Sequence, residues 1–284
     1  MKFWESTKAF LKTAHYLSLD VVVGAVFSHI MVARLPDGRQ PVDWATTVLL
    51  GLCVFIIYTV DRLYDVRKGL TSKATLTPRH RFHAEHQAVL IRVLLGLVVV
   101  CAILLFWLPK SVIWFGAALA LVSGAYVWGV SRLPASNRKL VWKEPAVTLL
   151  YTVGVWGSSW AQKPSIGWSE IGLGMLFLIV VFQNLLLFSV MEAQEFPEDS
   201  FSLATLWGFE RCDVVLRTFT GVVTVLALVI FFLADDRFAQ RAAIIEGMMS
   251  AVLYAIQRYP KSFLTNERYR WIGDGVFWLP FLIL

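Results

Sequence analysis

The chain has 284 residues, of which 57% are hydrophobic and 16% charged, with 12 tryptophans and a mean hydropathy of +0.64. A soluble domain carries roughly 25% charged residues, so the composition excludes an ordinary soluble protein. It predicts one integral membrane domain over residues 1–284. The formal net charge of +6 is explained below by the sidedness of the loops, so no nucleic-acid partner is expected.

Nine apolar runs follow one another along the chain. Each predicts a transmembrane helix, because lipid offers no partner for an unpaired backbone group. The runs are Tyr16–Ala33, Trp44–Val60, Ala88–Leu108, Val112–Val130, Ala146–Ala161, Ile171–Met191, Val214–Ala234, Ala242–Ile256 and Phe263–Leu284. The fifth and eighth are short for a span of about 20 residues. The expected fold class is all-α, a polytopic membrane protein with nine transmembrane helices.

The loop charges predict the orientation of these nine helices. One side of the membrane collects 18 Lys and Arg residues and the other 6, while Arg92 and Arg217 fall inside predicted helices. Because positive loops stay in the cytoplasm, the N-terminus is expected inside and Leu284 outside. No signal peptide is evident, since the first apolar run contains Asp20 and His29 and no cleavage site follows it. We expect the protein in a bacterial inner (plasma) membrane.

The second apolar run ends in Asp61 and Asp65, within the segment DRLYDVRKG. Four residues turn a helix through about 400°, so both carboxylates lie on one face. Mg²⁺ accepts such oxygen ligands and shares them with substrate phosphates. The pair therefore predicts a metal–diphosphate site at the membrane surface. The alternative is a solvated helix end with local ion pairs to Arg62, Arg67 and Lys68.

Basic residues follow this acidic pair and could bind the remaining oxygens of a diphosphate, because arginine presents a planar fork of donors. The candidates are Arg67, Lys68, Arg79, Arg132 and Lys139. Ordinary positive-inside residues would have the same placement. A transition-metal site at the histidines of HRFHAEH is disfavoured, because a spacing of three drifts by about 60° per step around a helix.

A second acidic segment follows the sixth apolar run. Its candidate metal ligands are Glu192, Glu195, Glu198 and Asp199. Glu192, Glu195 and Asp199 would share a face on a continuous helix, but Pro197 argues against full continuity. Asn184 brings a polar group into the span below, and such groups usually face a cavity or a partner helix. We therefore include it among the candidate substrate-binding residues.

These features resemble the UbiA superfamily of intramembrane prenyltransferases. The family's first motif, Asn-Asp-x-x-Asp-x-x-x-Asp, matches here in its last two members, Asp61 and Asp65, with Ile57 and Tyr58 at its start. The segment GAYVWGVSRLPASNRKLVWKEPAVTLLYTVGVW is similar to the family's helix 4 end, basic loop and helix 5 entry. EAQEFPEDSFSLATLWG is similar to its second motif in character and differs in register.

The resemblance implies nine helices around a central cavity and Mg²⁺-dependent transfer from a polyprenyl diphosphate to an acceptor. Asp61 and Asp65 would hold one ion and the second acidic segment another. Tyr126 is a candidate to stabilise the allylic cation through its ring quadrupole. One alternative is a UbiA-type terpene cyclase. Another is a non-catalytic isoprenoid-lipid-binding protein or a transporter, the latter suggested by ionisable groups such as Glu246 and Asp274 near spans. Partners are an isoprenoid diphosphate and membrane lipid, and no oligomeric state is predicted.

Overall fold

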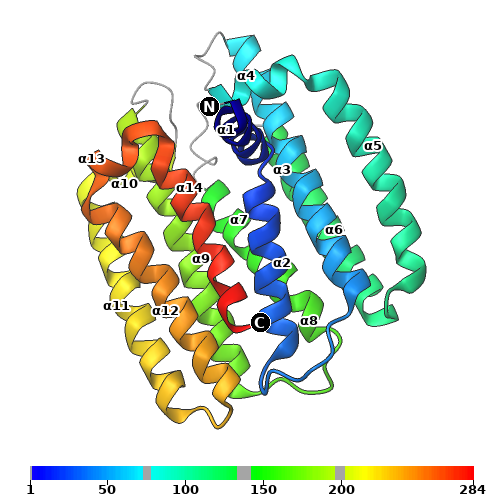
Figure 1. Cartoon of the computed structure of the whole chain (residues 1–284), viewed down its shortest axis with the longest axis vertical. Coiled ribbons are helices and arrows are strands. Elements are labelled where there is room, and N and C mark those ends of the chain that lie inside the picture. The colour runs from blue at the N-terminus through cyan, green and yellow to red at the C-terminus, as the bar shows by residue number, and fades with distance from the viewer. Residues whose placement is uncertain (1, 73–77, 133–141, 196–201) are drawn as a thin grey trace.

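The computed structural model describes residues 2–72, 78–132, 142–195 and 202–284, and every regular element in these ranges is a helix (Figure 1). The long helices are α1 (Lys2–Tyr16), α2 (Leu19–Arg34), α3 (Trp44–Ser72), α5 (Gln87–Leu104), α6 (Lys110–Ser131), α9 (Trp168–Glu195), α11 (Phe209–Leu233) and α12 (Arg237–Arg258). The short elements are α4 (Pro78–Glu85), η1 (Leu105–Trp107), α7 (Lys143–Thr152), the π-helical turn η3 (Val153–Gly157), α8 (Ser158–Trp160), α10 (Leu203–Trp207), α13 (Pro260–Leu264), η4 (Thr265–Glu267), α14 (Arg268–Gly275) and η5 (Val276–Ile283). The all-α prediction is confirmed for this part of the chain.

Five of the described helices, α3, α5, α6, α9 and α11, are long and apolar enough to cross a membrane. A sixth span results if α2 and the end of α1, which meet at an angle of 71°, count as one broken span. These helices indicate a membrane protein. Nine spans stay a prediction, because α12 carries charges at both ends and the last segment is divided into short pieces. The α14–η5 pair nevertheless rises about 28 Å, close to the roughly 30 Å of a bilayer core.

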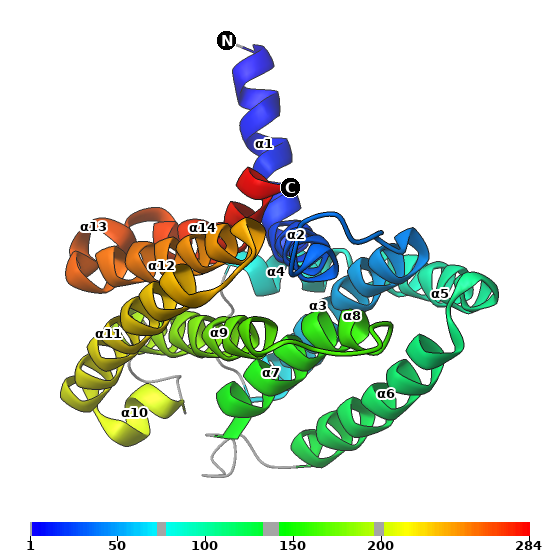
Figure 2. The same ribbon diagram turned by 90° about the horizontal axis from the view of Figure 1, so that it is seen from below.

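Helix α9 lies at the centre of the molecule, where it packs against α7, α10, α11, α12 and α14 (Figure 2). Its residues Leu176, Phe177 and Leu187 are fully buried, and Trp156 of η3 and Met249 of α12 join the same core. Because large apolar side chains dominate this core, their burial and close packing determine how the surrounding helices are arranged around α9.

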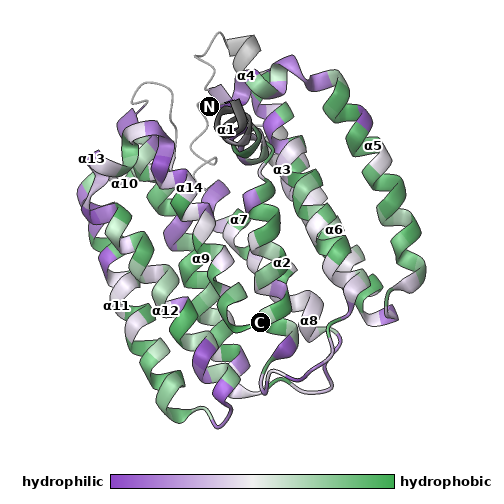
Figure 3. Ribbon diagram, viewed as in Figure 1, coloured by the Kyte–Doolittle hydropathy of each residue, from purple (hydrophilic) through white to green (hydrophobic). Residues whose placement is uncertain are grey.

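Helices α5 and α6 form the edge of the molecule that lies opposite α11 and α13 (Figure 2). Their surfaces expose large apolar side chains, among them Leu95, Val99, Trp114 and Leu121. In Figure 3 helix α5 is coloured as hydrophobic over most of its length. Exposed apolar surface on this scale is typical of contact with lipid.

The connections between the long helices alternate between the two ends of the molecule. The N-terminus, α4, α10 and α13 lie at one end, and the turns from α2 to α3, α5 to α6 and α11 to α12 at the other (Figure 1). Hydrophilic residues gather at the first of these ends (Figure 3). We call it the α4 end. Its cytoplasmic location remains a prediction from the loop charges.

Candidate functional site

A cavity of about 70 Å³ lies among helices that come from nearly the whole length of the chain. Its walls belong to α2, α3, α4, α7, α9, α14 and η5. Apolar lining comes from Val21, Val147, Val181, Leu185, Phe188 and Phe277, and polar lining from Tyr58, Arg62, Arg79, Tyr151, Asn184, Arg270 and Asp274. We call it the central cavity. Three arginines and one carboxylate make its polar lining positive.

The three arginines reach the cavity from α3, α4 and α14. Arg79 is only 5% exposed, and it donates 3.1 Å hydrogen bonds to the carbonyl oxygen of His15 and to Ser18 Oγ. Arg62 lies 3.9 Å from Asp65, and Arg270 is paired with Glu192. Burial, followed by repulsion from Arg62 and Arg270, lowers the pKa of Arg79 to about 10. A bound anion would relieve this repulsion.

Several polar atoms of the cavity wall have no hydrogen-bond partner among the described residues. They are Arg62 Nε, Arg79 Nε, Tyr151 Oη and Asn184 Oδ1. Buried polar groups are nearly always satisfied, so four unsatisfied atoms around one cavity call for a ligand or ordered water. Two belong to guanidinium groups and one to a phenol, so three of the four can donate to an anion.

The carboxylates of the first acidic motif converge on a single cation, which the chain supplies itself. Lys143 Nζ, at the start of α7, lies 3.3 Å from Asp61 Oδ1 and 3.9 Å from Asp65 Oδ2. Burial alone would lower the pKa of Lys143, but the two carboxylates raise it above its ordinary value. The predicted shared face of Asp61 and Asp65 is therefore present, with an ammonium group beside both. Neither aspartate is among the residues that line the cavity.

The second acidic segment is engaged by α14. Glu192 is paired with Arg270, and Glu195 accepts a 3.3 Å hydrogen bond from Tyr269 Oη. Arg270 also lines the cavity, so the second acidic segment is linked to the cavity wall by this arginine. Arg62 links the first motif to the wall in the same way. Glu198 and Asp199 lie outside the described residues.

The other predicted residues are spread over the α4 end. Arg79 and Asn184 line the cavity, and their role in substrate binding stays a prediction. Arg67 is exposed, and Arg132 is exposed with its guanidinium 4.1 Å from the Trp128 ring. The half-buried Tyr126 donates to the carbonyl oxygen of Lys143 at 3.5 Å. Lys139 and the side chain of Lys68 lie outside the described part.

Sequence reasoning missed Arg62, Arg270 and Tyr151 as neighbours of the site. It placed Arg62 only in a local ion pair and Arg270 only among the basic loop residues. Lys143 was grouped with the basic residues that could bind a diphosphate, and its contact with both aspartates was not expected. One signal was available for Lys143, because it opens the segment KEPAV just before an apolar run. A basic residue at that position reaches the same membrane surface as Asp61.

No protein-family model matches this chain, and neither the curated proteins nor the solved structures give a match. The likeness to the UbiA superfamily therefore depends on the three segments quoted above and on the predicted topology.

Proposed function

We propose that this protein is a UbiA-like intramembrane prenyltransferase that binds the diphosphate of a polyprenyl diphosphate in the central cavity. The observation that carries the proposal is the convergence of Arg62, Arg79 and Arg270 on one cavity, with a buried guanidinium nitrogen of Arg62 and one of Arg79 lacking a hydrogen-bond partner among the described residues. Charge-assisted hydrogen bonds from arginine to phosphate are among the strongest that a protein can offer.

The size of the cavity limits what it holds. Sites for whole drug-sized ligands measure roughly 300–1,000 Å³, whereas the central cavity measures about 70 Å³. It suits a head group, and the prenyl tail would lie outside it. An open apolar groove of about 370 Å³ runs between α2, α3 and α5, with Val22 and Phe55 in its wall. Val21 lines the cavity and Val22 the groove, and α3 contributes to the walls of both, so the two lie on adjoining faces of the same helices. We assign the tail to this groove, where each buried CH₂ contributes about 0.8 kcal/mol.

Within the described residues, the acidic segments do not fit the two-ion magnesium site that the resemblance implies. Lys143 occupies the position between Asp61 and Asp65, while Arg270 and Tyr269 take oxygens of Glu192 and Glu195. Charge neutralisation of the bound diphosphate is therefore assigned to the arginines. Magnesium dependence stays a prediction, and the experiment below measures it.

Prenyl transfer breaks the allylic C–O bond heterolytically. The electron pair leaves with the diphosphate, whose growing charge the arginines stabilise. The acceptor's nucleophile then forms a bond to the allylic carbon and gives up a proton. In a terpene cyclase the nucleophile would be a double bond of the same chain, so analysis of the product separates the two reactions.

A second candidate function is binding of an isoprenoid phosphate without turnover. The pairing of Asp61 and Asp65 with Lys143 favours it, because carboxylates held by an internal cation do not supply metal ligands. The two candidates share the same head-group site and differ only in whether diphosphate is released.

The test uses membrane vesicles from the producing cells, which supply acceptors, and geranylgeranyl diphosphate as the probe. Binding of labelled probe and release of pyrophosphate are measured with magnesium and with a chelator. Arg79→Gln removes a cavity arginine, and Arg92→Gln, on the exposed face of α5, is the matched control. Probe binding and pyrophosphate release should both decrease in Arg79→Gln and stay at the wild-type level in Arg92→Gln. Saturable binding without release would support the non-catalytic candidate, and equal binding by wild type and Arg79→Gln would exclude both.

A further inference from the structure

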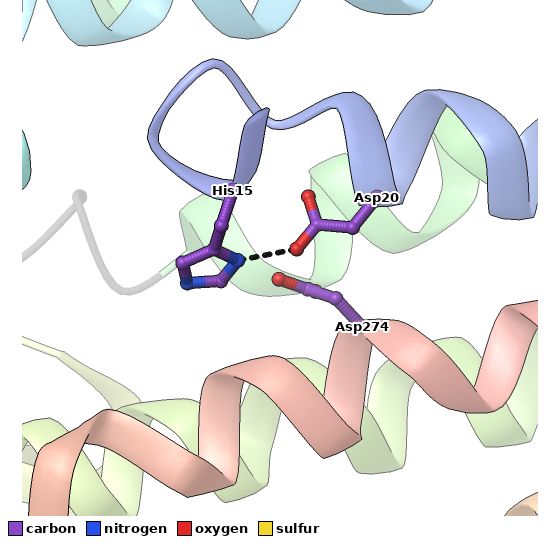
Figure 4. A group of neighbouring side chains, drawn as sticks. All are labelled: His15, Asp20 and Asp274. Carbon is purple, nitrogen blue, oxygen red and sulfur yellow. Dashed lines mark hydrogen bonds and ion pairs between the residues drawn. The ribbon is translucent and has the colours of Figure 1, made fainter. Parts of the chain in front are cut away.

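Three metal-ligating side chains meet at the wall of the central cavity, away from both acidic motifs. One ligand atom from each of His15, Asp20 and Asp274 lies within 4.8 Å of the other two. Figure 4 shows the His15 ring turned toward Asp20, with the Asp274 carboxylate directed at the pair from the facing helix. His15 and Asp274 are 2% and 7% exposed, so the cluster is almost closed to solvent.

The bend between α1 and α2 creates this cluster. In a continuous helix, residues 15 and 20 would be separated by about 140° around the axis. Ser18 instead adopts a left-handed conformation with φ 57°, and the chain turns by 71°. This conformation costs a non-glycine residue of order 1 kcal/mol. Arg79 holds the bend from the other side through Ser18 Oγ and the His15 carbonyl oxygen.

The His15–Asp20 pair is fixed within the cluster. His15 Nδ1 is hydrogen-bonded to Asp20 Oδ2, and the His15 ring stacks on Trp271 with 4.1 Å between centroids. Asp20 Oδ1 also accepts a 3.0 Å hydrogen bond from the backbone N–H of Val21. When Nδ1 ligates an ion, the hydrogen bond to Asp20 is given up and the ring proton is carried by Nε2, which has no other partner among the described residues. The Trp271 ring and the Val21 N–H still orient the two groups, which reduces the entropy lost on binding.

Asp274 is the member of the cluster that lacks a partner. Asp274 is only 7% exposed. Among the described residues it accepts no hydrogen bond and makes no ion pair within 4 Å. A buried carboxylate beside a second carboxylate is unfavourable unless a proton or a cation intervenes. Two carboxylates and a neutral imidazole offer a divalent ion three ligand atoms and a charge of −2, and Arg79 and Arg270 line the cavity wall next to Asp274.

We propose that His15, Asp20 and Asp274 bind one divalent transition-metal ion. An imidazole nitrogen with two carboxylate oxygens suits Mn²⁺, Fe²⁺ or Zn²⁺, whereas Mg²⁺ and Ca²⁺ prefer oxygen ligands alone. Three protein ligands leave coordination positions open, as in catalytic metal sites. Asp274 lines the central cavity, so the open positions adjoin the head-group site. The cluster is distinct from the Asp61–Asp65 pair, which Lys143 engages.

The experiment measures metal content and needs neither substrate nor activity. Full-length protein in detergent is stripped with a chelator, reloaded with Mn²⁺ or Zn²⁺ and passed over a desalting column. Bound metal is then counted by mass spectrometry. One ion per chain is expected for the wild type, and at least a tenfold weaker retention for Asp274→Asn and His15→Gln. The matched control is the double variant Asp61→Asn/Asp65→Asn, which should keep the ion.

Folding is checked for each variant by its elution as a single species. If Asp274→Asn aggregates, His15→Gln decides the result. Co²⁺ provides a second readout, because its visible absorption changes when an imidazole nitrogen enters its coordination sphere. A wild type that retains no metal would overturn the proposal, since a proton would then separate the two carboxylates. Retention by both cluster variants, or loss in the Asp61/Asp65 control, would overturn it as well. None of these results bears on head-group binding, which the Arg79→Gln experiment measures separately.

Discussion

Replacing Lys143 by glutamine tests whether this lysine occupies the cation position of the first acidic motif. Its Nζ lies within 4 Å of both Asp61 and Asp65, and glutamine removes the charge while keeping much of the side-chain volume. Like charges at i and i+4 on a helix destabilise it by about 0.2–0.5 kcal/mol. The variant should therefore be slightly less stable than the wild type when no divalent ion is present.

Magnesium should reverse this loss in the variant. For a site with a dissociation constant of about 1 mM, a value in the range of weak divalent sites, roughly 10 mM Mg²⁺ adds about 1.4 kcal/mol. A chain of this size shifts its melting temperature by roughly 2–4 °C per kcal/mol, so Lys143→Gln should melt about 3–6 °C higher with Mg²⁺. The wild type should shift much less, because the Lys143 ammonium group, together with Arg62 beside Asp65, already balances the charge of the two aspartates.

The assay is thermal unfolding in detergent, with NaCl at equal ionic strength to separate specific binding from screening. Lys143→Arg is the matched control, since it keeps the charge and should stay insensitive to magnesium. An equal magnesium shift in wild type and Lys143→Gln would show that the lysine does not compete for the site. No shift in Lys143→Gln would show that the two carboxylates cannot hold a divalent ion.

Three further predictions concern the cavity wall, pH and topology. A Cβ at Gly273 would lie 2.5 Å from Phe188 Cε1, whereas one at Gly275 meets nothing within 4 Å. Gly273→Ala should therefore lower the free energy of unfolding by about 1–3 kcal/mol and weaken head-group binding. Gly275→Ala is the control, and equal melting temperatures of the two variants would contradict the close packing at Gly273. Burial and three arginines lower the pKa of His80 to about 4. As the pH falls, the unfolded chain therefore takes up a proton at His80 at a higher pH than the folded chain does. Stability should be complete above pH 6.5 and decrease as the pH falls toward 4, and a pH dependence unchanged in His80→Gln would contradict this. A reporter active only in the cytoplasm and fused after Leu284 should be silent, and an active fusion would mean an even number of spans.

The sequence by itself determined the all-α class, the apolar helices typical of a membrane protein and the place of its long central helices. The apolar run Ile171–Met191 lies within α9, and Val214–Ala234 overlaps α11 except at its last residue. These runs were readable because helix formation in lipid depends on local composition and on internal backbone hydrogen bonds. The shared face of Asp61 and Asp65 was readable for the same reason, since a spacing of four is a property of one helix.

Only the tertiary structure decided what those residues contact. Arg62, Arg79 and Arg270 come from three helices, and no periodicity in the sequence relates them. His15 and Asp20 meet because Ser18 leaves the helical conformation, and Asp274 joins them from the far end of the chain. Lys143 reaches Asp61 and Asp65 from the start of α7, a helix that lies far from α3 in the sequence. A sequence pattern reports neighbours within one or two helical turns, whereas contacts between distant helices follow from how their buried faces fit together.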